Sequence, residues 1–268
     1  MLTLVPVASA ESNEKVLYSF QGGTWTEKVL YGFKSVAQGK ASGDGANPNG
    51  GLIFDAKGAI YGTTYFGGNN QKGVCEGGVG GTGCGTVFKL VPPTTNGGNW
   101  VEKILYRFKG GQEDGANPAA NAVFSATGDL FGATVFGPQG GWGTIFEGMK
   151  PVGKAPAWTE KLLYRFSDGK DGNSPEAGLI LDAHGNLYGT ARDGNPTWGS
   201  AFRLDPPRRK GGSWAFTLLD GFTDAPDGGN PAASLILDKQ STLYGTTQNG
   251  GTGTGCQVGC GTVFEVSP

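Results

Sequence analysis

The chain reads Gly-Leu-Ile-Phe-Asp at 51–55, Ile-Tyr-Gly-Thr-Thr at 60–64, Gly-Thr-Val-Phe-Lys-Leu at 85–90 and Trp-Val-Glu-Lys-Ile-Leu-Tyr-Arg-Phe at 100–108. The same four phrases return over 122–166 and 178–222, and the first three return over 234–266. Each phrase is a short apolar run bounded by Gly, Pro, Asn or Asp, a pattern typical of strands joined by turns. A repeat of this length with four strands indicates a β-propeller or a related array.

The repeats predict an all-β protein with a single domain over residues 11–268. No stretch of ten or more residues has helical periodicity, and the 51 glycines would weaken helices throughout. We expect a four-bladed β-propeller with four antiparallel strands in each blade. The blades are expected at about 50–108, 119–166, 176–222 and 232–268.

The fourth repeat lacks the Trp-led phrase, whereas one spare copy stands near the N-terminus as Trp25–Phe33. We expect 25–33 to be the outer strand of the fourth blade, because this arrangement closes the ring and removes a free sheet edge. A shorter copy, Glu14–Phe20, is left over. It predicts a strand that pairs outside this blade or with a neighbouring molecule. A larger ring built from two chains is the alternative.

Residues 1–10 are interpreted as the remnant of a signal peptide, because a short apolar run ends in Ala8-Ser9-Ala10. A disordered N-terminus is the alternative. No later segment is long and apolar enough to span a membrane. The net charge of −2 gives no indication of nucleic-acid binding.

The four cysteines occur in two pairs. Cys84 and Cys260 directly precede Gly-Thr-Val-Phe in their repeats, and each has an upstream partner in its own loop. This pattern predicts the disulfides Cys75–Cys84 and Cys256–Cys260, which are typical of a secreted, periplasmic or cell-surface protein. A four-thiolate zinc site is the alternative, although the spacings fit zinc poorly.

Five phrases in order carry a resemblance to a known family: Val-Leu-Tyr-Ser-Phe, Asp-Gly-Ala-Asn-Pro, Gly-Leu-Ile-Phe-Asp, Leu-Tyr-Gly-Thr-Thr and the glycine-rich run before Gly-Thr-Val-Phe-Lys-Leu. They resemble the GloVer-type (Gloeo/Verruco) tandem repeat over roughly 14–266. The resemblance implies an exported bacterial protein with a propeller-like fold, often anchored at the cell surface. It implies no particular ligand or reaction.

One face of such an array gathers the residues that break the repeat. It carries the loops between repeats and the loops between the second and third strands. Where the first and fourth repeats have a cysteine, the middle two have Trp142 and Trp198, whose indoles are suited to stacking on a sugar or an aromatic ligand. Filling the gap left by a disulfide is the alternative role. The candidate ligand-binding residues are Trp142, Trp198, Tyr65, Phe66, Phe136, Arg192 and Asp193.

The loops between repeats share the motif Asp-Gly-x-x-Pro, with Asn before the Pro in three of the four copies. Its acidic residues, Asp44, Asp114, Asp171 and Asp227, are weak candidates for a Ca²⁺ site, and no other cofactor is expected. The competing interpretation is structural, since Asp and Asn bond their own backbone, Gly adopts positive φ and Pro begins the next strand.

Catalysis receives little support from the sequence. The single histidine, His184, lies in a turn expected on the opposite face, which disfavours a Ser-His-Asp triad or a histidine-based metal site. We therefore expect a secreted or cell-surface module that binds a glycan or another surface molecule without catalysis. One alternative is a self-assembly module that uses residues 14–20. Another is a carbohydrate-active enzyme with a carboxylate pair.

Overall fold

The computed structural model describes residues 27–34, 42–69, 75, 83–151, 157–167 and 169–267. The predicted signal-peptide remnant, Trp25 and the leftover strand 14–20 lie outside these residues. The chain divides into two units, Met1–Leu30 and Tyr31–Pro268, and every strand named below belongs to the second unit.

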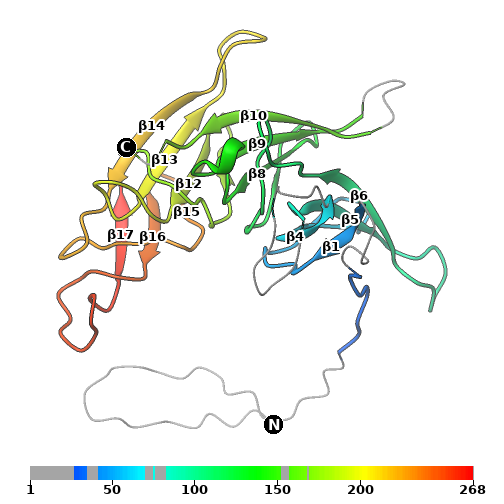
Figure 1. The fold of residues 1–268 in the computed structure, drawn as a ribbon, viewed down its shortest axis with the longest axis horizontal. Coiled ribbons are helices and arrows are strands. Elements are labelled where there is room, and N and C mark those ends of the chain that lie inside the picture. The colour runs from blue at the N-terminus through cyan, green and yellow to red at the C-terminus, as the bar shows by residue number, and fades with distance from the viewer. Residues whose placement is uncertain are drawn as a thin grey trace. The chain divides into compact units, whose positions relative to one another are not determined.

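Three complete repeats form three antiparallel sheets of four strands (Figure 1). The first sheet contains β2 (Ile53–Phe54), β3 (Ile60–Thr64), β5 (Thr86–Val91) and β6 (Val101–Arg107). The second contains β7 (Val123–Phe124), β8 (Leu130–Thr134), β9 (Thr144–Met149) and β10 (Thr159–Arg165). The third contains β11 (Ile180–Leu181), β12 (Leu187–Ala191), β13 (Ser200–Asp205) and β14 (Ala215–Gly221). Strand order within each sheet follows chain order, as the sequence predicts.

The fourth sheet has three strands, β15 (Ile236–Leu237), β16 (Leu243–Thr247) and β17 (Thr262–Val266). Residues 27–33, the described part of the expected outer strand, form no strand, and β17 pairs only with β16 within the described ranges. The predicted closure of a ring by 25–33 is therefore not observed. A single turn of 3-10 helix, η1 (Pro138–Gly140), interrupts the second repeat.

A fifth, two-stranded sheet joins β1 (Ser42–Ala46) to β4 (Phe66–Asn69), which the sequence did not indicate. The same two loops meet in the later repeats through single bridges, such as Ala116 with Phe136 and Asn173 with Asp193. The first repeat extends this bridge into a sheet, so the count of sheets differs from the expected four. The pairing shows that the two sets of loops lie together, and we call the surface they form the loop face.

Each second strand carries a glycine opposite a phenylalanine of the third strand. The four pairs are Gly62–Phe88, Gly132–Phe146, Gly189–Phe202 and Gly245–Phe264. A Cβ added at Gly132 would lie 2.6 Å from Cζ of Phe146. The glycine therefore leaves room for the ring, which explains why the phrase Leu-Tyr-Gly-Thr recurs.

Aromatic pairs connect each outer strand to the following sheet. The ring of Phe108 lies 5.1 Å from that of Phe146, and Phe166 lies 5.3 Å from Phe202. Phe33, which ends the N-terminal Trp-led phrase, lies 5.0 Å from Phe88 of the first sheet. Phe33 thus packs on the first sheet as the end of each complete repeat packs on the next.

Apolar side chains are buried between sheets and exposed on the first and last ones. Val263 of β17 is 82% exposed, whereas its counterpart in the first sheet, Val87, is 2% exposed. Leu52, next to β2, is 56% exposed, whereas Leu179 and Leu235 at the same position are 3% and 2% exposed. The first and fourth sheets therefore carry exposed apolar side chains at positions that are buried where two sheets face each other.

Candidate functional site

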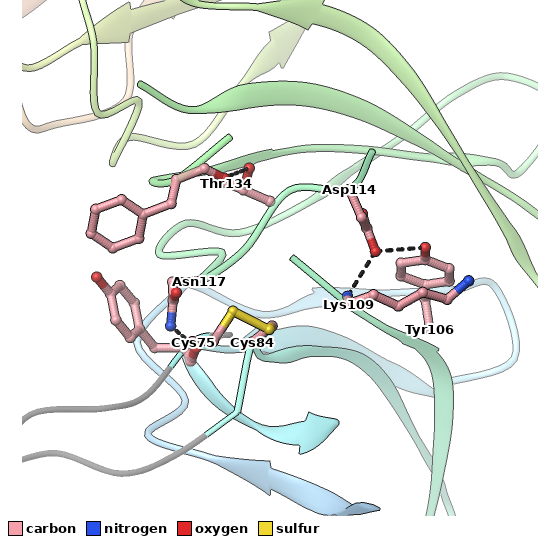
Figure 2. The surroundings of a disulfide bond; sticks show 9 residues. Cys75, Cys84, Tyr106, Lys109, Asp114, Asn117 and Thr134 are labelled. Carbon is pink, nitrogen blue, oxygen red and sulfur yellow. Dashed lines mark hydrogen bonds between the residues drawn. A yellow bond between two sulfur atoms is a disulfide. The ribbon is translucent and has the colours of Figure 1, made fainter. Parts of the chain in front are cut away.

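The aspartates of the Asp-Gly-x-x-Pro loops hold the end of the preceding outer strand. Asp114, which is 6% exposed, accepts hydrogen bonds from the Tyr106 hydroxyl at 2.9 Å and from the Lys109 amide at 2.7 Å (Figure 2). Burial raises the pKa of Asp114, although these hydrogen bonds favour its charged form. Asp171 receives the same bonds from Tyr164 and Ser167.

The asparagines of these loops tie each repeat to the one before it. The Asn117 side chain donates to the carbonyl oxygen of Tyr65 at 2.8 Å, and Asn230 donates to that of Arg192 at 3.2 Å. Asn117 lies beside the Cys75–Cys84 disulfide, and its backbone adopts φ 60° (Figure 2). These bonds give the motif an architectural role. The described residues contain no group of three His, Cys, Asp or Glu side chains placed to hold a metal ion.

Both predicted disulfides are present, Cys75–Cys84 and Cys256–Cys260. Cys84 is fully buried, whereas Cys256 and Cys260 are exposed. The thiols are therefore paired rather than grouped around zinc. Two disulfides are consistent with an extracellular or periplasmic location. No described helix is long and apolar enough to cross a membrane.

The position before Gly-Thr-Val-Phe has a fixed backbone and a variable side chain. The carbonyl oxygens of Cys84, Trp142 and Trp198 each accept a hydrogen bond from the following repeat, at 2.8, 2.9 and 2.7 Å. Trp142 is 48% exposed and Trp198 is 46% exposed, whereas Cys84 is fully buried. Both indoles remain open to a ligand.

The other candidate residues occupy two adjacent positions after the second strand. Tyr65 and Phe66 contact each other edge to face, with ring centroids 4.7 Å apart. Phe136 is 44% exposed, and Arg192 forms an ion pair with Glu176 at 3.6 Å. These residues are distributed over three repeats. Among them, Asp193 lines one pocket together with Trp198.

This pocket, of about 320 Å³, is lined by residues 193–198 and Asn230, and we call it the Trp198 pocket. The Asn230 side chain donates to Oδ1 of Asp193 at 2.6 Å. Thr197 Oγ1 is buried without a hydrogen-bond partner among the described residues, so the pocket wall holds an unsatisfied polar atom. The sequence did not single out Asn195, Thr197 or Asn230. Asn195 and Thr197 directly precede Trp198 in the chain, whereas Asn230 reaches the pocket through the fold.

Two carboxylates with raised pKa values, Glu102 and Glu160, belong to the outer strands β6 and β10 rather than to the loops. Burial raises the pKa of Glu160 to about 7 and that of Glu102 to about 6. Glu160 lines a small cavity between the first and second sheets with Tyr106 and Trp158. His184 projects from the turn after β11, with 87% of its side chain exposed. These groups do not combine into a catalytic arrangement with the tryptophans.

The model of the Gloeobacter/Verrucomicrobia repeat matches residues 74–268. A crystal structure of a protein of unknown function from Dyadobacter fermentans DSM 18053 is similar, with a TM-score of 0.44 and 12% sequence identity. The match covers 79% of this chain and 64% of that one, so the chain spans less than two thirds of that protein. No curated protein matches the chain. Because the repeat model covers most of the sequence, the chain belongs to the Gloeobacter/Verrucomicrobia repeat family.

Proposed function

We propose that this protein is an exported, non-enzymatic module that binds a glycan on its loop face. The supporting observation is the pair of half-exposed indoles, Trp142 and Trp198, at the position where the first repeat has a buried cysteine. A planar apolar ring that carries one polar edge is suited to the face of a sugar. Neither residue is needed for the repeat backbone, because Cys84 makes the equivalent carbonyl hydrogen bond.

Two indoles in successive repeats suit a polymeric ligand. They stand one repeat apart, and each lies just before a third strand, β9 or β13. If both indoles bind the same oligosaccharide, the second contact forms within the complex. Two weak contacts then give a higher overall affinity than either one alone. Secretion or surface display would bring such a module to extracellular polysaccharides, and the two disulfides support this location.

Titration calorimetry with neutral and charged oligosaccharides tests the proposal. For a glycan that binds, Trp142→Ala and Trp198→Ala should each weaken binding by about tenfold or more, as loss of an aromatic anchor does. Val101→Ala is the matched control, because Val101 is an exposed apolar residue of β6 outside the loop face. An unchanged affinity in the folded double variant would contradict the proposal.

Self-assembly is the second candidate function, and the exposed apolar side chains of the first and fourth sheets favour it. Phe54 and Ile236 are 66% and 67% exposed, beside Leu52 and Val263. Because equivalent side chains are buried between successive sheets, the two faces are suited to cover each other. We propose that they do so between copies, so that the sheets act as blades of a propeller-type ring.

Light scattering distinguishes the outcomes. Association between copies should give a mass of at least twice the 27.6 kDa of one chain. Leu52→Glu and Val263→Lys should each give monomers, and mixing the two variants should restore a dimer through the remaining native faces. A monomeric wild type would instead favour the ring closed within one chain that the sequence predicts.

A further inference from the structure

The two exposed indoles have different surroundings, although their backbones are equivalent. In the second repeat, the position two residues after β8 is Phe136, and the corresponding position after β12 is Asp193. The equivalence follows from the bridges, because Phe136 pairs with Ala116 as Asp193 pairs with Asn173. A carboxylate therefore stands near Trp198 where the neighbouring repeat has an aromatic ring.

The carboxylate of Asp193 is held by a chain of amides. Asn249 donates to the side-chain oxygen of Asn230 at 2.7 Å, and Asn230 donates to Oδ1 of Asp193 at 2.6 Å. The backbone of Asp193 is fixed as well, because its carbonyl accepts from the Asn173 amide at 2.6 Å. No described residue donates a hydrogen bond to Oδ2. Asp193 is thus oriented through one oxygen, and the other remains for a ligand.

The charge in this region is negative. No lysine or arginine lines the Trp198 pocket, and the adjacent Arg192 is paired with Glu176. A second carboxylate lies near the base of the indole. Both groups lie close to Gly229. A Cβ added at Gly229 would lie 3.1 Å from Cβ of Trp198 and 3.6 Å from Oδ1 of Asp224. The Trp198 Cβ and the Asp224 Oδ1 are therefore at most about 7 Å apart. Asp224 Oδ1 is buried without a partner among the described residues.

We infer that the Trp198 pocket selects an amino sugar, whose protonated amine pairs with the carboxylate of Asp193 while its ring stacks on the indole. The inference rests on the proposed glycan binding and adds the class of sugar. A hydrogen bond between two charged groups is shorter and stronger than one between neutral groups, and a cation near an indole face is attracted to it. Trp142, which has Phe136 and Gly137 at the equivalent positions, takes an uncharged sugar ring.

The test compares a glucosamine oligomer with its fully N-acetylated counterpart of the same length. Calorimetry at a pH of about 5.5 to 6 keeps the amine of the glucosamine oligomer protonated. The wild type should bind the glucosamine oligomer about tenfold more tightly, as one charge-assisted hydrogen bond provides. Asp193→Asn should bring the two affinities to within about twofold. This change is isosteric, and the new amide oxygen still accepts the Asn230 hydrogen bond.

Trp142→Ala is the matched control, and it should weaken both oligomers while preserving the preference for the charged one. Equal binding of the two oligomers by the wild type, or a preference that survives Asp193→Asn, would overturn the inference and leave the proposed function standing. If neither these oligomers nor any neutral oligosaccharide binds, both the inference and the proposed function are wrong.

Discussion

The hydroxyl of Tyr106 donates to the carboxylate of Asp114 over 2.9 Å, and this bond links the outer strand of one repeat to the loop that begins the next. The equivalent bonds join Tyr31 to Asp44 and Tyr164 to Asp171. The fourth loop differs, because Asp220 stands where the tyrosine would be, and the exposed carboxylate of Asp227 accepts hydrogen bonds from the amide and the hydroxyl of Thr223.

Asp114→Ala should therefore destabilise the protein more than Asp227→Ala. The first change removes the partner of a half-buried tyrosine hydroxyl and of a backbone amide, which should cost about 2–3 kcal/mol in the free energy of unfolding. The second change removes bonds that water replaces, and it should cost under about 1 kcal/mol. Urea unfolding of both variants provides the comparison. Equal losses of stability would show that the tyrosine bond contributes nothing.

Gly189→Ala should destabilise the third sheet. An added Cβ would lie 2.8 Å from both Cζ of Phe202 and Cδ2 of Leu179, so these buried side chains would have to move. Overpacking of this kind costs about 1–3 kcal/mol. Gly255→Ala is the control, because a Cβ there meets nothing within 4 Å. The melting temperature of each variant is the measurement, and a Gly189→Ala protein as stable as wild type would refute the steric explanation for the repeated glycine.

Ionisation of Glu160 should lower the free energy of unfolding as the pH rises. Burial, reinforced by the charge of Asp114, raises its pKa from the ordinary 4.5 to about 7, so the folded state favours the protonated form. The stabilising contribution is complete below about pH 4.5 and is lost as the pH rises through about 7. With an allowance for partial exposure, the loss amounts to about 2 kcal/mol.

Urea unfolding at several pH values measures this effect. Glu160→Gln should flatten the fall in stability between about pH 5 and 8, because the amide does not ionise. Glu113→Gln is the control, because it makes the same chemical change at an exposed position. Glu102 contributes in the same direction through its own raised pKa, so some decline should persist in the Glu160 variant. If the Glu160→Gln variant had the same pH profile as wild type, Glu160 would not be a cause of the decline in stability.

The two disulfides should differ in their accessibility to reductant. Cys84 is fully buried and Cys75 is half-buried, whereas Cys256 and Cys260 are both exposed. A small thiol should therefore reduce Cys256–Cys260 first, because attack on a buried sulfur requires local opening. Alkylation followed by mass spectrometry gives the order of reduction. Simultaneous reduction of both bonds would mean that the loop around Cys75 opens freely.

Much of the fold could be predicted because the strand and turn patterns of the repeat occur three or four times in the sequence. Short sequence phrases encode both recurring features. One is the glycine opposite a phenylalanine, as at Gly132 and Phe146, and the other is the turn built on Asp114. The closure of the array could not be predicted in this way. Whether 25–33 pairs with β17 depends on a contact between residues more than two hundred positions apart, and no local pattern fixes it.

The candidate site was predicted only in part for a similar reason. Trp142 and Trp198 stand out in the sequence because they interrupt a repeated pattern, and Asp193 stands out as an irregular residue in its loop. The pocket depends on Asn230, which belongs to the next repeat and donates to Asp193 across the junction. In the sequence, Asn230 looks like one more copy of a turn residue, so its second role is visible only in three dimensions.

The fixed backbone at Cys84, Trp142 and Trp198 has an evolutionary consequence. Main-chain hydrogen bonds hold this position whatever side chain it carries, so a substitution there changes the surface without disturbing its neighbours. Selection or protein engineering can therefore vary the side chain at this position in each repeat independently, on an unchanged backbone. Exchanging Trp142 or Trp198 for other residues should redirect recognition while the array folds as before.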